Sequence, residues 1–189
     1  MDAYADVLRR SNARSQLSHV VRELFDVSDV HAEPWLAASY YSSLKGEPET
    51  ALQFCDRAVG FHRRRASAHL FRGELLLALH RPEHALSAFM TSCKLHRGLE
   101  AYAGVVSSYC ELYSIGVNRY KEAVTTARSV VKLFPRKAKS YTLLGRVYAL
   151  RSEHQDEAKR ALLKALTLDP RNVAATMALA DVMVSDGEC

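Results

Sequence analysis

Eight histidines and four cysteines are the residues of this chain that could bind a transition metal. A tetrahedral site needs several such ligands at short, regular spacing, as in a Cys-x2-Cys pair. His62, His69 and His80 fall in different helical turns and faces, and no two cysteines have that spacing. We therefore expect no metal site and no cofactor. His69 is expected instead to be a packed core residue.

Motifs of nucleophilic and phosphate chemistry do not occur in the sequence. It contains no Gly-x4-Gly-Lys-Ser/Thr, Gly-x-Gly-x-x-Gly, Gly-x-Ser-x-Gly or His-Glu-x-x-His. Glu47 and Glu49 are a pair of carboxylates, but they fall at a turn between helices, where acidic residues ordinarily cap the following helix. The sequence therefore predicts a protein that is not an enzyme and has no small-molecule substrate.

The four cysteines, Cys55, Cys93, Cys110 and Cys189, are too scattered to form a disulfide framework. They indicate reduced and mostly buried thiols in a reducing compartment. No apolar run is long enough to cross a bilayer. We expect an intracellular protein, in the nucleus, the cytoplasm or both, with no membrane partner.

The net charge of +5 comes largely from basic clusters at residues 9–10, 62–65 and 136–139. A basic surface can bind acidic proteins or nucleic acid. Cations also stabilise the carbonyl ends of helices, and we favour this ordinary role. A binding edge at Arg63, Arg64 and Arg65 stays an alternative.

An internal repeat must position all these residues. The segment from Tyr141 to Pro170 matches the W-x2-L-G-x2-Y…A-x3-F…P pattern of the 34-residue tetratricopeptide unit, with one extra residue in the turn. The same spacing recurs in earlier segments, one of which has about five extra residues near positions 112–118. Large side chains fill the gap between helix pairs, small ones allow close crossing, and prolines end helices. The predicted repeat-packing residues are Trp35, Ala51, Gly73, Ala85, Phe89, Tyr102, Ala123, Pro135, Tyr141, Gly145, Tyr148, Ala158 and Pro170.

This pattern predicts an all-α, right-handed superhelical solenoid of tetratricopeptide helix-turn-helix repeats with about eleven helices. We expect one array over residues 1–189. It consists of a partial repeat at 1–30, four repeats at 32–65, 66–98, 99–137 and 138–172, and a terminal helix at 173–186. Both ends are expected to be cuts through a longer array.

In such an array the first helix of each pair lines a concave face. Its inward places predict a protein-binding groove that is mostly apolar in its first half and suits an extended or helical segment. Packing within a repeat, or against a missing neighbour, is the competing interpretation. The predicted groove residues are Leu36, Tyr40, Leu70, Phe71, Glu74, Ser107, Thr142 and Arg146.

Two known uses of similar repeats are disfavoured. Repeats that grip acidic chaperone tails use a clamp of Lys, Asn and Arg on their first helices, but none of the three asparagines falls on the expected concave face. Pentatricopeptide repeats read RNA, yet this repeat has the protein-binding signature and few inward cations. We expect no nucleic-acid partner.

The segment Leu24-Phe25-Asp26-Val27-Ser28-Asp29-Val30-His31-Ala32-Glu33-Pro34-Trp35 resembles the subunit 7 family of the anaphase-promoting complex (cyclosome). Weaker similarity follows in the same order over nearly the whole chain, and it matches the C-terminal half of that family. The insertion near 112–118 departs from the family. The related tetratricopeptide subunits 3, 6 and 8 of that complex stay open as alternatives.

The resemblance implies a non-catalytic scaffold subunit of a ubiquitin ligase that acts in cell-cycle control and mitotic exit. Its partners would be other tetratricopeptide subunits of the same complex. The family dimerises through N-terminal repeats, so this chain is expected to be monomeric by itself. A generic tetratricopeptide adaptor of another multiprotein assembly is the alternative.

Overall fold

The computed structural model describes residues 2–185, and all regular structure in that part of the chain is helical. The eleven α-helices found there confirm the predicted all-α class. By compactness the chain divides into two units, Met1–Arg97 and Gly98–Cys189. Unit 1 contains α1 to α6, and unit 2 contains α7 to α11.

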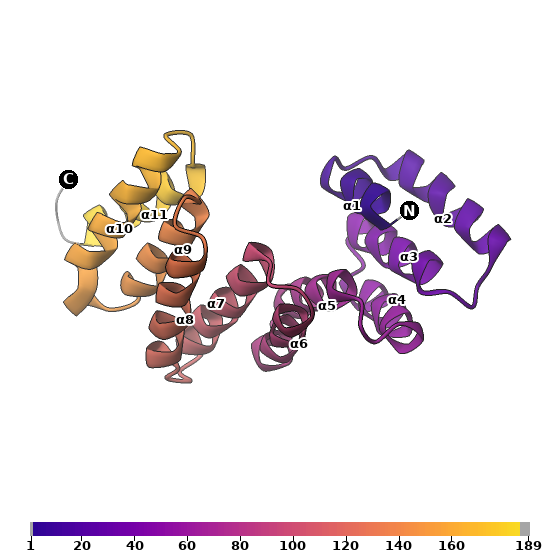
Figure 1. Ribbon diagram of the computed structural model, residues 1–189, viewed down its shortest axis with the longest axis horizontal. Coiled ribbons are helices and arrows are strands. Elements are labelled where there is room, and N and C mark those ends of the chain that lie inside the picture. The colour runs from indigo at the N-terminus through magenta and orange to yellow at the C-terminus, as the bar shows by residue number, and fades with distance from the viewer. Residues whose placement is uncertain (1, 186–189) are drawn as a thin grey trace. The chain divides into compact units, whose positions relative to one another are not determined.

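Unit 1 is a series of helices joined by short turns (Figure 1). Consecutive helices pack on one another, and α1 also packs on α3. The helices are α1 (Asp2–Arg10), α2 (Arg14–Val27), α3 (Ala32–Lys45), α4 (Pro48–Phe61), α5 (Ala66–Ala78) and α6 (Pro82–Leu95).

Unit 2 continues the same alternation of helix and turn. Here α9 packs on four other elements, α7, α8, α10 and α11, and so forms the middle of the unit. The helices are α7 (Leu99–Ser114), α8 (Tyr120–Leu133), α9 (Ala138–Tyr148), α10 (Gln155–Leu168) and α11 (Val173–Ser185), with a short 3-10 helix, η1 (Ser152–His154), before α10.

Proline and glycine mark the helix ends. Pro48 and Pro82 begin α4 and α6, where the missing N–H has no partner to lose. Gly46 ends α3 with a φ of 82°, the left-handed conformation that glycine adopts most easily. Pro135 and Pro170 lie outside the helices, in the turns after α8 and α10, where they terminate helices as predicted.

The extra residues of the third repeat lengthen its first helix and loosen its turn. Helix α7 has 16 residues, against 11 to 14 in α3, α5 and α9. The turn that follows contains Gly116 at a φ of 89°, and the Val117 N–H donates to the Leu112 carbonyl oxygen at 2.9 Å. The insertion is therefore absorbed without breaking the helix pair.

Small residues form the centres of the helix crossings. Ala51, Ala85, Ala123 and Ala158 are completely buried, as their place in the repeat predicts. The aromatic residues pack around them: Trp35 lies 5.0 Å from Phe25 and 5.9 Å from Phe54, and Tyr102 lies 6.3 Å from Phe134, between ring centroids. Phe89 and Tyr148 are buried, and Tyr141 packs partly buried against the α9–α10–α11 core.

His69 does not lie in the core, contrary to the prediction. Its side chain is only half-buried near the start of α5, and its Nε2 lies 2.8 Å from the Arg63 carbonyl oxygen. The leading aromatic place of this repeat is thus used to brace the preceding turn, because an imidazole can satisfy a backbone carbonyl that a phenyl ring cannot.

Candidate protein-binding surfaces

A hollow of about 250 Å³ opens on unit 1 between α1, α3 and α5. Four of the predicted groove residues meet there, which supports their assignment to one surface. These are Tyr40, Leu70, Phe71 and Glu74. The sequence analysis missed the other half of the lining, which comes mainly from α1 and includes Asp6, Arg9 and Arg10.

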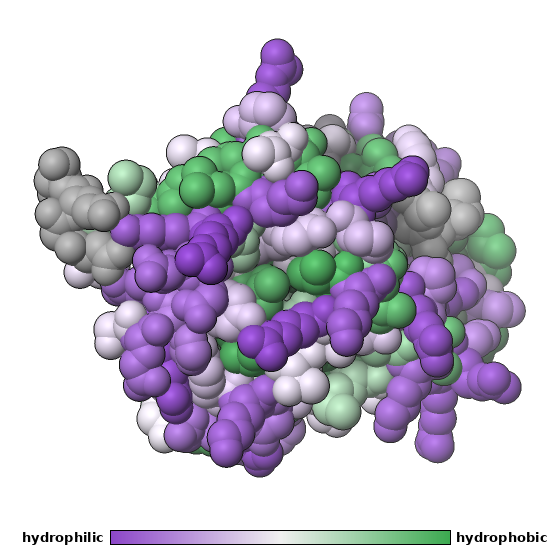
Figure 2. Space-filling view, turned by 60° about the vertical axis from the view of Figure 1, so that its left-hand side comes forward, coloured by the Kyte–Doolittle hydropathy of each residue, from purple (hydrophilic) through white to green (hydrophobic). Residues whose placement is uncertain are grey.

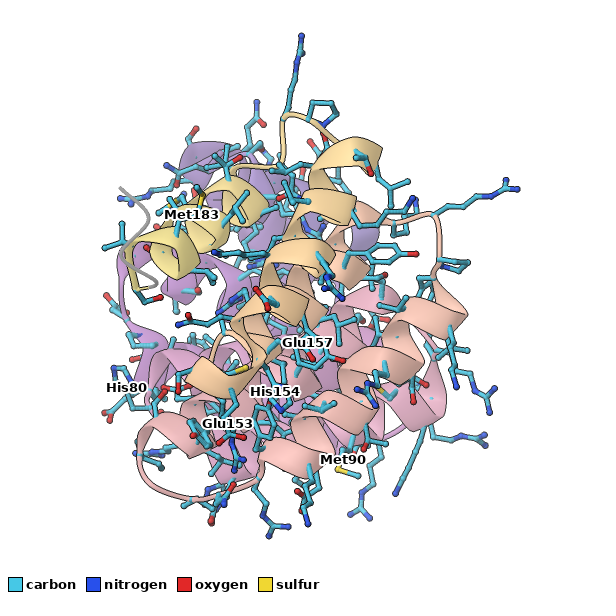
Figure 3. The ribbon with its side chains drawn as sticks, turned by 90° about the vertical axis from the view of Figure 1, so that its left-hand side faces the viewer. His80, Met90, Glu153, His154, Glu157 and Met183 are labelled. Carbon is cyan, nitrogen blue, oxygen red and sulfur yellow. The ribbon has the colours of Figure 1, made fainter. Side chains whose placement is uncertain are left out.

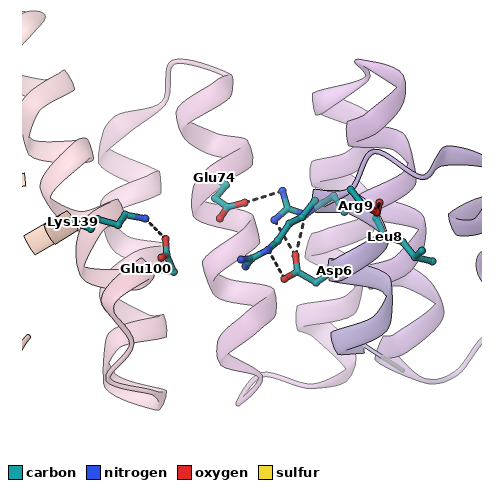
Figure 4. Close-up of polar contacts among 8 residues, drawn as sticks. Asp6, Leu8, Arg9, Glu74, Glu100 and Lys139 are labelled. Atoms are coloured by element: carbon teal, nitrogen blue, oxygen red, sulfur yellow. Dashed lines mark hydrogen bonds and ion pairs between the residues drawn. The ribbon is translucent and has the colours of Figure 1, made fainter. Parts of the chain in front are cut away.

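Arg9 of α1 covers the aromatic floor of this hollow. Its guanidinium carbon lies 4.7 Å from the centre of the Phe71 ring and 5.3 Å from that of Tyr40. The two rings meet edge to face at 4.5 Å. Arg9 also pairs with Asp6 at 3.0 Å and with Glu74 at 3.3 Å (Figure 4). The floor is therefore aromatic, but the surface that a partner would meet is charged.

Burial corrects the prediction for the apolar groove residues. Leu36 has no exposed surface, and Tyr40 and Phe71 are each 3% exposed. These inward places of α3 and α5 pack first helices onto one another and onto α1, so partner contact there would require α1 to move. Leu70 and Glu74 stay half-exposed and accessible.

The missed residues follow the same register as the predicted ones. Trp35 is the first place of its repeat, so counting back one 34-residue unit makes Met1 the first place of the partial repeat. Its inward fifth, sixth and ninth places are then Ala5, Asp6 and Arg9. Extending the pattern into residues 1–30 would have found both ionic residues.

Unit 2 has a hollow of about 450 Å³ lined by α7, α9 and α11. It brings together Ser107 and Arg146, which were predicted, with Glu111 and Asp181. The hollow thus contains one cation and two carboxylates on three neighbouring first helices. Such a mixed lining suits a polar protein segment better than the apolar ligand expected in the first half of the groove.

Thr142 was predicted to face this groove but is 4% exposed. Its Oγ1 donates to the Ala138 carbonyl oxygen at 3.2 Å, and Asn172 Nδ2 donates to Oγ1 at 3.2 Å. The hydrogen bonds of this hydroxyl thus lie within α9 and between α9 and the turn that joins α10 to α11. Thr142 is therefore a packing residue in this structure.

Cys110 also lines the unit 2 hollow, but its chemistry is that of a neutral thiol. Burial raises the pKa of Cys110, and the nearby Arg146 only partly offsets this. Burial likewise raises the pKa of Cys55 to about 12 and that of Cys93 to about 11. A thiolate nucleophile is disfavoured at each of these sites.

A second cluster in unit 2 combines rings and charges beside η1. His154 stacks on Tyr120 with ring centroids 5.8 Å apart, and its Nδ1 lies 3.7 Å from Glu157 Oε1 (Figure 3). Arg128 donates to the Tyr148 hydroxyl at 2.9 Å. These contacts join α8 to α9 and to the start of α10, so we assign them to packing.

Some residues of the basic clusters form ion pairs within the chain. Arg65 pairs with Glu33, and Lys139 pairs with Glu100 within unit 2 (Figure 4). The hydrogen bond from Arg65 holds the pKa of Glu33 below its usual value. Arg63 and Arg64 stay exposed, as do Arg136 and Lys137.

Helix α11 exposes apolar side chains. Val173, Met177 and Val184 are each more than 60% exposed, and Figure 2 shows a face on which apolar side chains reach the surface between polar ones.

Metal-binding and membrane-spanning features are not found in the described part of the chain. Within residues 2–185, no three His, Cys, Asp or Glu side chains are grouped so that they could hold a metal ion. In the same residues, no helix is both long and apolar enough to span a bilayer.

Comparison with known proteins identifies one repeat by its sequence and the fold of most of the chain by its structure. The family model described as "Tetratricopeptide repeat" matches residues 138–172, which are α9, η1 and α10. A Thermus thermophilus tetratricopeptide protein has a similar fold, with a TM-score of 0.71 at 24% identity, over 83% of this chain and 84% of that one. The fold is a tetratricopeptide-repeat array.

Curated relatives extend the similarity over nearly the whole chain. Anaphase-promoting complex subunit 7 of Arabidopsis thaliana is 32% identical over 99% of this chain, and that of Dictyostelium discoideum is 30% identical over 99%. The Homo sapiens subunit 7 is 28% identical over 97%. The chain spans about a third of the length of each of these relatives (32%, 31% and 32%).

A solved structure extends the fold similarity over the same length. A tetratricopeptide chain from a structure titled "Crystal structure of APC/C hetero-tetramer Cut9-Hcn1" matches 99% of this chain with 36% of its own. The TM-score is 0.83 at 18% identity, which supports the fold alone. The resemblance to subunit 7 of the anaphase-promoting complex rests on the curated relatives, which confirm it.

Proposed function

We propose that the chain is a non-catalytic, protein-binding scaffold segment of a subunit 7 of the anaphase-promoting complex, acting in cell-cycle control. The observation that carries this proposal is the continuous similarity to subunit 7 of three distant organisms at 28–32% identity, over 97–99% of the chain. Each repeat packs only on its neighbours. A similarity due to the repeat pattern alone would therefore be expected in single repeats and not continuously along the chain.

The two hollows support a protein-binding role. Each is lined by first helices of neighbouring pairs and contains exposed or half-exposed charged residues, such as Glu74 in unit 1 and Arg146 in unit 2. Charged linings give specificity and faster association with protein partners more than they give raw affinity. We infer that the partners are other tetratricopeptide subunits of the complex, in the nucleus or cytoplasm.

The test is co-purification of the chain with separately purified tetratricopeptide subunits of the complex. We expect at least one subunit to bind, and Arg146→Glu to weaken that binding roughly 10-fold or more. Arg160→Glu is the matched control, because it makes the same charge change at an exposed place on the outer helix α10.

Binding to none of these subunits at micromolar concentrations would overturn the proposal. Binding to proteins outside the complex in its place would favour the generic adaptor. Equal loss for Arg146→Glu and Arg160→Glu would leave the scaffold role intact but show that the unit 2 hollow is not the contact.

A further inference from the structure

The connection between α2 and α3 is braced yet exposes two apolar side chains. Val27 is 84% exposed and Val30 is 65% exposed. The Ser28 hydroxyl lies 2.8 Å from His31 Nδ1, and the Trp35 indole N–H donates to the Asp29 carbonyl oxygen at 2.7 Å. The valines are therefore displayed on a fixed segment, and their exposure is not a result of looseness.

Two carboxylates accompany these valines. Asp26 and Asp29 are exposed, and within residues 2–185 neither carboxylate takes part in an ion pair. Asp26 lies in the last turn of α2, where the helix dipole favours a cation and opposes an anion. Helix stability does not explain an acidic residue at this place.

An oppositely charged turn lies beside this connection. Arg63 and Arg64, in the turn between α4 and α5, are exposed and make no ion pair in the described residues. The next residue, Arg65, pairs with Glu33 at the start of α3. The guanidinium carbon of Arg57 lies 4.2 Å from the Trp35 ring centre, and Phe61, one turn later, is 48% exposed.

We name this surface the mixed-charge edge; it consists of Asp26, Val27, Asp29, Val30, Phe61, Arg63 and Arg64. Its two carboxylates belong to the α2–α3 connection and its two guanidinium groups to the α4–α5 turn, and both segments expose apolar side chains. Such a surface is complementary to itself when a second copy lies along it in the opposite direction. A two-fold contact needs this property, because every contact between one residue of the first copy and another residue of the second copy occurs again with the two copies exchanged.

We propose that the mixed-charge edge is a weak self-association site, on which a second copy of this chain docks with two-fold symmetry. The aspartates of one copy meet Arg63 and Arg64 of the other, and Val27, Val30 and Phe61 pack where the two edges cross. The proposal is independent of the scaffold function, because it uses a turn edge outside both hollows.

Charge favours a second copy over other occupants. A nucleic acid or an acidic peptide would meet Arg63 and Arg64 favourably but would be repelled by Asp26 and Asp29. A basic peptide would meet the opposite problem. Two exposed ion-pair sets and three apolar side chains form a small contact, which places the association among weak, transient interfaces.

The test is the oligomeric state of the whole chain by analytical ultracentrifugation, at up to roughly 100 µM, a range suited to weak contacts. We expect a concentration-dependent dimer that weakens when salt is raised from about 0.05 to 0.5 M, because the ion pairs are exposed. Asp26→Arg with Asp29→Arg, and separately Arg63→Asp with Arg64→Asp, should each weaken the dimer about 10-fold or more.

Mixing the two charge-reversed variants provides the decisive measurement. In the mixture every arginine again meets an aspartate, so a heterodimer should form with an affinity close to that of the unaltered chain. Rescue in trans also shows that both variants are folded. Arg136→Asp with Lys137→Asp, which reverses a similar exposed turn of unit 2, should leave the dimer unchanged.

Three outcomes would overturn this proposal. One is a chain that stays monomeric over the whole concentration range, and another is a dimer that neither charge reversal affects. The third is failure of the mixed variants to associate when both retain the helical circular dichroism of the parent. None of these outcomes bears on binding to other subunits, so the two proposals can fail separately.

Discussion

Two glycines set how closely the helices of a pair approach. A Cβ atom at Gly73 would lie 2.6 Å from the Phe89 ring, and one at Gly145 would lie 2.5 Å from Leu162 Cγ. The sequence predicts a small alanine as the counterpart across the crossing. In the structure the nearest side chain is instead the large residue four places after that alanine. The absent Cβ thus makes room for a side chain that fills the core.

Gly145→Ala should destabilise the protein by about 1–3 kcal/mol, because one methyl group overpacks the α9–α10 crossing. The added Cβ would also lie 3.3 Å from the Ala158 carbonyl oxygen, so a shift of Leu162 alone would still leave a tight contact with the α10 backbone. Gly60→Ala in α4 is the matched control, because nothing lies within 4 Å of its added Cβ. There the gain in helix propensity should stabilise by up to about 1 kcal/mol.

Urea unfolding of both variants measures the difference. If Gly145→Ala is as stable as the parent, α10 can move away from α9 and the crossing is not close-packed.

Glu33 gives a pH dependence of known sign. The hydrogen bond from Arg65 lowers its pKa in the folded protein below the usual 4.5. Its contribution to stability is therefore present above the unfolded-state pKa and is lost as the pH falls through the folded-state value. Glu33→Gln should lower the melting temperature at about pH 7 and have progressively less effect below about pH 4.5. A deficit that persists undiminished at about pH 2 would contradict this account.

At the scale of elements, α1 acts as a cover for the first helices of unit 1. It packs on both α2 and α3, and Ala5 and Leu8 are buried there. Arg9 extends this cover over the Tyr40 and Phe71 rings. The apolar half of the predicted groove is thus closed by the chain itself.

Arg9→Ala should destabilise the protein by about 1–2 kcal/mol, because it removes a partly desolvated cation from two rings together with its ion pairs. Arg10→Ala should cost less than about 0.5 kcal/mol, since Arg10 is largely exposed and makes one surface pair with Asp6. Thermal unfolding of the two variants compares them. Equal effects would show that Arg9 is not the cover.

The whole molecule is two compact helical units with separate hollows. In repeat arrays the stability comes from contacts between neighbouring repeats. Each of the two compact units accordingly contains its own helix crossings and its own buried alanines. The hollow of unit 1 is lined by Asp6, Arg9 and Glu74, and that of unit 2 by Glu111, Arg146 and Asp181. Each unit therefore has its own hollow with a charged lining.

Far-ultraviolet circular dichroism of the whole chain should show about four-fifths helix, in line with the 81% helical content of the structure.

The buried aromatic pair Tyr40 and Phe71 contributes to the packing of these helices. Tyr40→Ala with Phe71→Ala should therefore lower the melting temperature, since both side chains are 3% exposed. A substantial β signal in the parent, or a double variant as stable as the parent, would contradict this packing.

The repeat pattern alone determined the fold class. Glycine, alanine, aromatic and proline residues recur at fixed places because each repeat solves the same packing problem with its neighbour. Gly73, Gly145 and Ala158 can therefore be assigned to helix crossings from their spacing in the chain. The resemblance carried by residues 24–35 likewise lies in the order of the amino acids and depends on no tertiary contact.

Only the tertiary structure decided which inward residues are accessible. Leu36, Tyr40 and Phe71 have the same places in their repeats as accessible residues elsewhere, but α1 and the crossing helices cover them. Accessibility depends on what neighbouring helices place above a residue, and those neighbours are distant in sequence. The ion pair that Arg9 of α1 makes with Glu74 of α5 helps to hold Arg9 over the Tyr40 and Phe71 rings.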